Sequence, residues 1–224
     1  MGEDTRMHKK IETVIFDMDG LMFDTEHLSR IIWIKLFNKL NYPVKEEFFQ
    51  LITGSNIHDS INYFNQCYPK SKYSFIELKD IKNKEMVDDI LKNGAPIKKG
   101  LFELLKYLKE NKYNILLATS TSKEQALTIL NKAGATTYFD NMIFGDEVIN
   151  SKPNPEIFIK VASKVNSIPS NCLVLEDSKN GVNAACKGGF NCIYIPDTIF
   201  FEPPQGVIKK DSLDQVIDYL ELNN

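Results

Sequence analysis

The second half of the chain alternates short apolar runs with stretches of helical periodicity. The apolar runs cover residues 115–118, 142–144, 173–175 and 193–195, and the helical stretches cover residues 101–108, 123–133, 155–165, 178–187 and 213–222. Apolar runs of this length, bounded by polar residues, are typical of strands buried on both faces. Strands that alternate with helices in this way predict an α/β fold, with helices on both faces of a parallel sheet.

Another apolar run, residues 13–16, is separated from this alternation by a block of different character. Within the block, apolar residues recur at helical spacing from Leu28 to Leu40, and Pro43 ends that helix. Further helices are expected around residues 46–52, 58–68 and 75–91. The first strand therefore belongs to the sheet, although a helical block separates the two in sequence.

This interruption predicts two structural parts. We expect an α/β core formed by residues 1–23 and 94–224, and an α-helical domain formed by residues 24–93. The helical domain is an insertion, because the core strands lie on both sides of it in the sequence.

Two aspartates, Asp17 and Asp19, directly follow the first apolar run. Aspartate is a poor strand former, and unpaired charge at the edge of a core is costly. A calcium loop that began at Asp17 would need Gly and Glu where Met22 and Leu28 stand. Taken alone, the pair could be two solvated loop carboxylates. It would also suit a Mg²⁺ ion, or a carboxylate that attacks phosphorus.

Polar residues also follow the later apolar runs, at the strand ends where open parallel sheets bind ligands. Residues 119–122 are Thr-Ser-Thr-Ser, residues 176–178 are Glu-Asp-Ser, and Lys152 precedes a helix. Taken alone, Ser120 could cap a helix, Lys152 could be a solvated lysine, and the acidic pair could support a helix N-terminus. Together they predict one crevice that combines carboxylates, hydroxyls and a lysine.

In these residues the chain resembles the haloacid dehalogenase superfamily, in the branch that carries a helical cap after the first motif. The matching motifs are Phe-Asp-Met-Asp-Gly-Leu at 16–21, Ala-Thr-Ser at 118–120, Lys-Pro-Asn-Pro-Glu-Ile-Phe at 152–158 and Leu-Glu-Asp-Ser-Lys-Asn-Gly at 175–181. All four are in the family's order. The resemblance implies a Rossmann-like parallel sheet sandwiched by helices, and a Mg²⁺-dependent phosphatase that forms an aspartyl-phosphate.

The resemblance also implies catalytic roles for four residues. Asp17 would be the nucleophile that takes the phosphoryl group. Asp19 would protonate the leaving alkoxide and later activate water. A general acid and base at this position favours the hydrolysis of esters. Ser120 would hold a non-bridging phosphate oxygen, and Lys152 would neutralise charge on the phosphate and the nucleophile.

A metal site and further binding residues follow from the same resemblance. Mg²⁺ would be held by Asp17, by Asp177 and by the main-chain carbonyl of Asp19, with Glu176 as a ligand or as support. The substrate and its phosphate would be bound by Ser120, Lys152, Thr121, Thr25 and Glu26. The expected partner is a small phosphorylated metabolite.

Residues of the helical block distinguish a phosphatase from the alternative function, a β-phosphoglucomutase-type isomerase. Mutases of this branch typically carry a His where Ser29 stands, and a cap arginine that is missing from residues 54–59. His27 and His58 could replace that cation, although a lone His near a helix start is more often a surface residue. Asp-Thr-Glu at 24–26 is more similar to sugar-phosphate and nucleoside-phosphate phosphatases. We therefore favour a phosphatase over a mutase.

A third function, a protein that binds phosphorylated ligands without turnover, has less support. Its signature would be the loss of a catalytic carboxylate such as Asp17 or Asp177, and both are present.

Charge and cysteine content limit the setting and the partners. The net charge of -3 gives no electrostatic case for nucleic acid or an anionic membrane. The four cysteines form no C-x-x-C pair and no zinc spacing, so we expect free thiols in the reducing cytoplasm.

No apolar segment is long enough to span a bilayer. We expect a monomer, with Met7 as a candidate natural start and residues 1–6 as a leader.

Overall fold

The computed structural model describes residues 10–52, 55 and 57–223. Within these residues, six strands form one sheet in the order β3-β2-β1-β4-β5-β6, and each neighbouring pair is parallel. The strands are β1 (Thr13–Phe16), β2 (Asn114–Ala118), β3 (Asn141–Ile143), β4 (Cys172–Glu176), β5 (Asn191–Tyr194) and β6 (Ile208–Lys209). The predicted parallel α/β fold is confirmed. The short strand β6 was not predicted, because two residues give no periodic signal.

Helices cover both faces of the sheet, as expected for strands buried on both sides. The core helices are α5 (Leu101–Glu110), α6 (Lys123–Ala133), α7 (Glu156–Ser163), α8 (Lys179–Lys187) and α9 (Gln215–Asn223). Successive residues of β1 point to opposite faces: Val14 and Phe16 join the core with α5, α6 and α9, whereas Ile15 joins the core with α7 and α8. The fully apolar strand is therefore explained by two separate hydrophobic layers.

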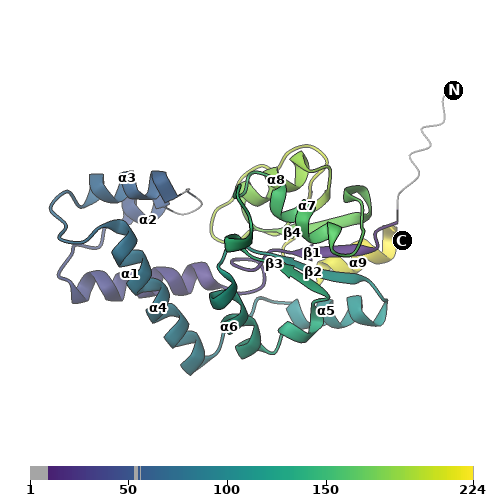
Figure 1. Cartoon of the computed structure of the whole chain (residues 1–224), viewed down its shortest axis with the longest axis horizontal. Helices are drawn as coiled ribbons and strands as arrows, with labels where there is room; N and C mark the ends of the chain where they lie inside the picture. Colours follow the sequence, from purple (N-terminus) through teal and green to yellow (C-terminus); the bar gives the residue numbers. More distant parts are fainter. Residues whose placement is uncertain (1–9, 53–54, 56, 224) are drawn as a thin grey trace.

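Four helices between β1 and α5 lie to one side of the sheet, and we call them the helical insertion (Figure 1). They are α1 (Thr25–Lys39), α2 (Glu46–Ile52), α3 (Ile57–Cys67) and α4 (Phe75–Asn93). The start of α4 is fixed by a capping box, in which Ser74 and Glu77 satisfy each other's main-chain N–H groups. No helix in the described residues is long and apolar enough to cross a membrane.

The helical insertion has a hydrophobic core of its own, built largely from aromatic side chains. Phe48 is fully buried at its centre, with ring centroids 5.5 Å from Phe37, 5.9 Å from Trp33 and 6.0 Å from Phe64. These residues form a cluster distinct from the two layers around the sheet. A separate core is what an independently folding unit requires, so this cluster supports the predicted division into two domains.

The two chain crossings between the insertion and the sheet lie side by side. Phe23 and Ile97 form an isolated antiparallel bridge, and the N–H of Asp24 donates to the carbonyl of Pro96 at 2.8 Å. The insertion therefore leaves and rejoins the core through one paired connection. This arrangement places the insertion next to the residues that follow β1.

Phe48→Ala tests whether the insertion is a separate folding unit. The cavity left in the aromatic cluster should destabilise the insertion by about 3–5 kcal/mol. Trp33 is the only tryptophan of the chain and belongs to this cluster, so its fluorescence reports on the insertion. We expect the Trp33 fluorescence of this variant to change at a lower urea concentration than the far-UV circular dichroism of the sheet.

The matched control is Phe200→Ala, which removes the same side chain from a position that is 71% exposed. Its effect should be about 0.5 kcal/mol or less. If both signals of Phe48→Ala moved together by the same amount, the two parts would be one cooperative unit.

Candidate active site

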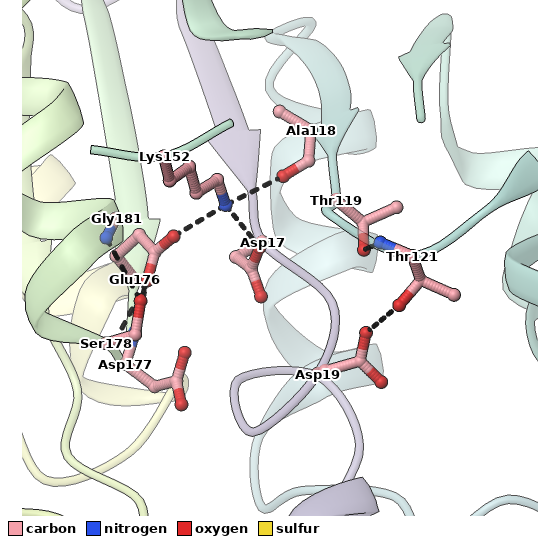
Figure 2. A network of polar contacts seen from close by, with 10 residues as sticks. All are labelled: Asp17, Asp19, Ala118, Thr119, Thr121, Lys152, Glu176, Asp177, Ser178 and Gly181. Carbon is pink, nitrogen blue, oxygen red and sulfur yellow. Dashed lines mark hydrogen bonds and ion pairs between the residues drawn. The ribbon is translucent and has the colours of Figure 1, made fainter. Parts of the chain in front are cut away.

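The ends of three neighbouring strands bring the predicted site residues together. β1 lies between β2 and β4, and in this register Phe16 pairs with Leu117 on one side and Leu175 on the other. Asp17 follows β1 directly, and Glu176 is the last residue of β4. Because parallel strands end at the same edge of the sheet, residues far apart in the sequence share one small volume (Figure 2).

Lys152 is the centre of this volume. Its Nζ donates to Asp17 Oδ1 at 2.5 Å, to Glu176 Oε1 at 2.7 Å and to the carbonyl of Ala118 at 3.1 Å. The side chain is only 6% exposed, and the ammonium lies 4.8 Å from the centre of the Phe158 ring. The sequence-based alternative, a solvated surface lysine, is therefore wrong.

This buried charge network changes how its members titrate. Burial raises the pKa of Asp17 to about 7; the positive charge of Lys152 opposes this increase, and the negative charge of Glu176 reinforces it. Burial alone would lower the pKa of Lys152, but the carboxylates of Asp17 and Glu176 raise it above its ordinary value. Lys152 therefore stays charged at neutral pH, and each carboxylate depends on it.

Glu176 has both carboxylate oxygens occupied. Oε1 accepts from Lys152, and Oε2 accepts from the main-chain N–H groups of Asp177 and Ser178 at 3.0 Å and from Ser178 Oγ at 2.9 Å. Gly181 is required here, because a Cβ at that position would overlap the Glu176 carboxylate. Of the two expected roles, metal ligand or support, this geometry favours support of Lys152 and of the start of α8.

Asp19 is held by hydroxyl groups from two different parts of the chain. Its Oδ1 accepts from Thr25 Oγ1 at 2.8 Å, and its Oδ2 accepts from Thr121 Oγ1 at 2.5 Å. Thr25 begins α1 and Thr121 follows β2, so the helical insertion and the sheet both orient this carboxylate. Thr25 and Thr121 were predicted as substrate-binding residues, and in this structure their hydroxyls bind Asp19.

Asp177 directly follows β4 and is another carboxylate of the site. In Figure 2 it faces the same space as the second oxygen of Asp17. Burial and the negative charges of Glu176, Asp17 and Asp197 raise its pKa well above the ordinary value. A nearby cation would offset this repulsion.

These donors fit a Mg²⁺ ion. In the described residues, no three His, Cys, Asp or Glu side chains form a complete metal cage. Mg²⁺ does not need one, because it is usually bound through one or two carboxylates together with substrate phosphate oxygens and water. Asp17 and Asp177 supply two carboxylates that face one space, and the main-chain carbonyl of Asp19 is a third oxygen nearby.

A cavity of about 870 Å³ opens between the sheet and the helical insertion. Asp19, Ser120 and Thr121 line it from the sheet side, and Thr25 and Glu26 line it from the start of α1. Ser120 is exposed to this cavity, as a residue that contacts a ligand must be. Ser120, Thr121, Thr25 and Glu26 therefore line one cavity, whereas Lys152, the fifth residue predicted to bind substrate or phosphate, is not among its lining residues.

Three cationic residues of the cavity wall, Arg30, Lys79 and Lys82, are absent from the predicted site. Lys82 is 7% exposed and donates to Ser29 Oγ at 3.1 Å, and burial lowers its pKa. Arg30 pairs with Glu46 at 2.5 Å and lies 4.7 Å from the Phe49 ring centre. Lys82 carries a sequence signal, because it interrupts the buried apolar stripe of α4 formed by Leu78, Met86 and Ile90.

The histidines weighed as replacements for a cap arginine differ in position. His27 lines the cavity, whereas the side chain of His58 is 83% exposed and lies 3.7 Å from Asp59. Gly54 and Asn56, from the stretch of residues 54–59 that lacks arginine, lie outside the described residues.

The family model of haloacid dehalogenase-like hydrolases matches residues 14–195, which includes all four motifs. The chain belongs to this family.

Individual relatives agree with the family assignment. A "Phosphorylated carbohydrates phosphatase" of Thermotoga maritima is 33% identical over 82% of this chain and 84% of that protein. A "Probable pseudouridine-5'-phosphatase" of Drosophila melanogaster is 30% identical over 84% of this chain and 83% of that protein. The crystal structure of a β-phosphoglucomutase from Clostridium difficile matches with a TM-score of 0.75 and 26% identity, over 95% of this chain and 96% of that one.

These findings confirm the expected family, the Rossmann-like fold and the enzyme class, a phosphoric monoester hydrolase of the haloacid dehalogenase type.

Lys152→Met tests whether the buried lysine holds the site together. The variant leaves Asp17 and Glu176 buried without their cation, which should cost about 3–5 kcal/mol of unfolding free energy. Urea denaturation at neutral pH measures this loss. Lys160→Met is the control, because it breaks the Lys160–Glu156 pair, in which the lysine side chain is 44% exposed. That change should cost about 0.5 kcal/mol or less, and equal effects of the two variants would contradict our interpretation.

Proposed function

We propose that this hydrolase is a Mg²⁺-dependent phosphatase of small phosphorylated metabolites, of the sugar-phosphate or nucleoside-monophosphate type. The observation that carries the proposal is the juxtaposition of Asp17, fixed by Lys152, with Asp19, oriented by two hydroxyls at the floor of the cavity. In this proposal the first group attacks phosphorus, and the second exchanges a proton with the ester oxygen. A cytoplasmic location and a monomeric state belong to the same proposal.

Asp17 would act through the oxygen that Lys152 does not bind. Attack of Oδ2 on phosphorus forms an aspartyl-phosphate and breaks the ester bond to the leaving alkoxide, which takes a proton from Asp19. Asp19 then accepts a proton from the water that attacks the aspartyl-phosphate, and Asp17 is released with inorganic phosphate. The hydroxyls of Thr25 and Thr121 hold Asp19 in place for both steps.

Lys152 would contribute charge rather than a directed hydrogen bond to the substrate. An ammonium group has three N–H donors, and Asp17, Glu176 and the Ala118 carbonyl accept from it. Ser120, whose side chain is exposed to the cavity, is the group available to donate to a non-bridging phosphate oxygen. A Mg²⁺ ion bound by Asp17, Asp177 and the Asp19 carbonyl would offset the charge of the phosphate and polarise it.

The cavity supports a small polar substrate. Its volume of about 870 Å³ is in the range of metabolite sites, and its wall includes Lys82, Ser29 and Glu26. A buried ammonium next to a hydroxyl and a carboxylate would bind the hydroxyl groups of a sugar. The names of the two phosphatase relatives, which refer to carbohydrate and nucleoside phosphates, agree with this substrate class.

The helical insertion also supports phosphatase over mutase. A bisphosphate intermediate needs a cation for its second phosphate. The arginine on the cavity wall, Arg30, is already paired with Glu46. Ser29, which stands where mutases carry histidine, accepts a hydrogen bond from Lys82.

Replacing the two aspartates tests their roles. Asp17→Asn should abolish phosphate release, and Asp19→Asn should lower kcat by about 10²–10⁴-fold, as expected for a lost general acid and base. Both variants should keep the wild-type circular dichroism spectrum. The control is Asp211→Asn at an exposed position, which should leave the rate unchanged. Measurable turnover by Asp17→Asn would refute its role as the nucleophile.

The reaction itself is tested with a substrate panel in the presence of Mg²⁺. Phosphate release would be measured with hexose and pentose phosphates, nucleoside monophosphates and p-nitrophenyl phosphate. In parallel, conversion of β-glucose 1-phosphate to glucose 6-phosphate would be followed with a trace of the 1,6-bisphosphate. We expect phosphate release that EDTA stops and Mg²⁺ restores, and isomerisation faster than release would make the protein a mutase.

Lys82→Met tests the proposed contact with the substrate. Loss of a charged hydrogen bond to a substrate hydroxyl should raise KM about tenfold or more, with a smaller change in kcat. Lys84→Met is the control, because Lys84 lies on the exposed side of the same helix. An unchanged KM for the best substrate of the panel would show that Lys82 does not contact it.

A further inference from the structure

Asp197 is a buried carboxylate that none of the motifs includes. It follows β5, and its side chain is 8% exposed. Its Oδ1 accepts from Lys98 Nζ at 2.6 Å, whereas its Oδ2 is buried and has no hydrogen-bond partner in the described residues. A buried carboxylate oxygen without a donor is unfavourable, so a partner outside the protein chain is expected there.

The free oxygen faces the proposed cation site. A Cβ built on Gly20 would lie 3.4 Å from Asp197 Oδ2 and would overlap the carboxylate of Asp177. Gly20 has a φ of +82°, and its lack of a side chain leaves room for both carboxylates. Asp197 and Asp177 therefore share the space next to the loop that follows β1.

Main-chain hydrogen bonds fix both members of the ion pair relative to this loop. The N–H of Ile195, two residues before Asp197, donates to the carbonyl of Glu176 at 2.8 Å. The N–H of Lys98 donates to the carbonyl of Met22 at 2.9 Å. Lys98 thus holds one oxygen of Asp197 and leaves the other directed at Gly20 and Asp177.

From this geometry we propose that Asp197 is a positioning residue of the divalent cation site, and that its Oδ2 accepts from the cation's water ligands. The inference rests on the cation site of the proposed function. Direct coordination is not favoured, because no three acidic side chains in the described residues lie close enough to hold one ion. Mg²⁺ keeps several waters in protein sites, and carboxylates that bind such waters strengthen the site.

The competing interpretation is that Lys98 and Asp197 form an ordinary structural ion pair. The chain offers a matched pair of that kind next to it, in which Lys99 Nζ lies 3.2 Å from Asp214 Oδ2. Asp214 also has a buried oxygen, Oδ1, without a partner in the described residues. Asp214 differs in that it lies against Gly100 rather than Gly20, away from the proposed cation.

The test is a direct titration of the metal-free full-length protein with Mn²⁺, followed by electron paramagnetic resonance of the free ion. Asp197→Asn should weaken Mn²⁺ binding about tenfold or more. Asp214→Asn should leave the affinity unchanged. Lys98→Met breaks the same ion pair but keeps the carboxylate, and it should bind Mn²⁺ at least as tightly as the wild type because a positive charge is removed.

Each outcome decides a different point. Binding by Asp197→Asn within twofold of the wild type, or equal weakening by Lys98→Met, would overturn the role of Asp197. A wild-type protein that bound no Mn²⁺ would refute the cation site itself, and with it the proposed function. Thermal unfolding in EDTA confirms that each variant is folded, and if Asp197→Asn does not fold, weaker binding by Lys98→Met overturns the inference.

Discussion

The buried ammonium of Lys152 is the constraint on which the rest of the site depends. It lies between Asp17 and Glu176, two carboxylates at the ends of neighbouring strands, and it also binds the last carbonyl of β2. Without it, the sheet would end in buried negative charges that repel one another. With it, three strand ends are joined by one side chain that comes from the segment before α7.

This constraint connects the fold to the chemistry. The Lys152 contacts require β1, β2 and β4 to end at the same level, which the parallel register provides. Glu176 in turn accepts from the N–H groups of Asp177 and Ser178, directly before α8, so the approach to this helix and the position of Lys152 depend on the same carboxylate. A one-residue shift of β4 would turn its side chains to the opposite face and take Glu176 away from Lys152.

Much of this arrangement could be predicted from the sequence, and the reasons are local. Each strand is a short apolar run, and each chemical group stands directly after a run, so the topology of parallel strands places Asp17, Ser120 and Glu176 together. The partners of these groups were harder to predict. Thr25 and Thr121 were expected to bind substrate, but their hydroxyls bind Asp19, a contact that depends on how α1 meets the sheet.

The burial of Lys82 and Asp197 could not be predicted from the sequence motifs. Both are charged residues outside the motifs, and their importance comes from burial, which depends on segments distant in the sequence. Lys82 meets Ser29 across the helical insertion, and Asp197 meets Lys98 across the connection between the two parts. Periodicity could indicate that Lys82 faces inward, but no pattern near Asp197 reports that its second oxygen is buried.

Under the proposed function, the charge balance of the site assigns chemistry and substrate selection to different sides of the cavity. Asp17, Asp177 and Asp197 lie close together on the sheet side, and the donors of Lys152 are already used within the protein. A phosphate dianion would be repelled there unless a divalent cation arrived with it or before it. The sheet side is therefore committed to balancing charge around the phosphate. In the proposed function, recognition of the rest of the substrate then falls to the opposite wall, where Lys82 is supplied by a helix outside the sheet. The contacts that Lys152 makes with Asp17, Glu176 and the Ala118 carbonyl do not involve Lys82, so a substitution at Lys82 should leave this charge network in place.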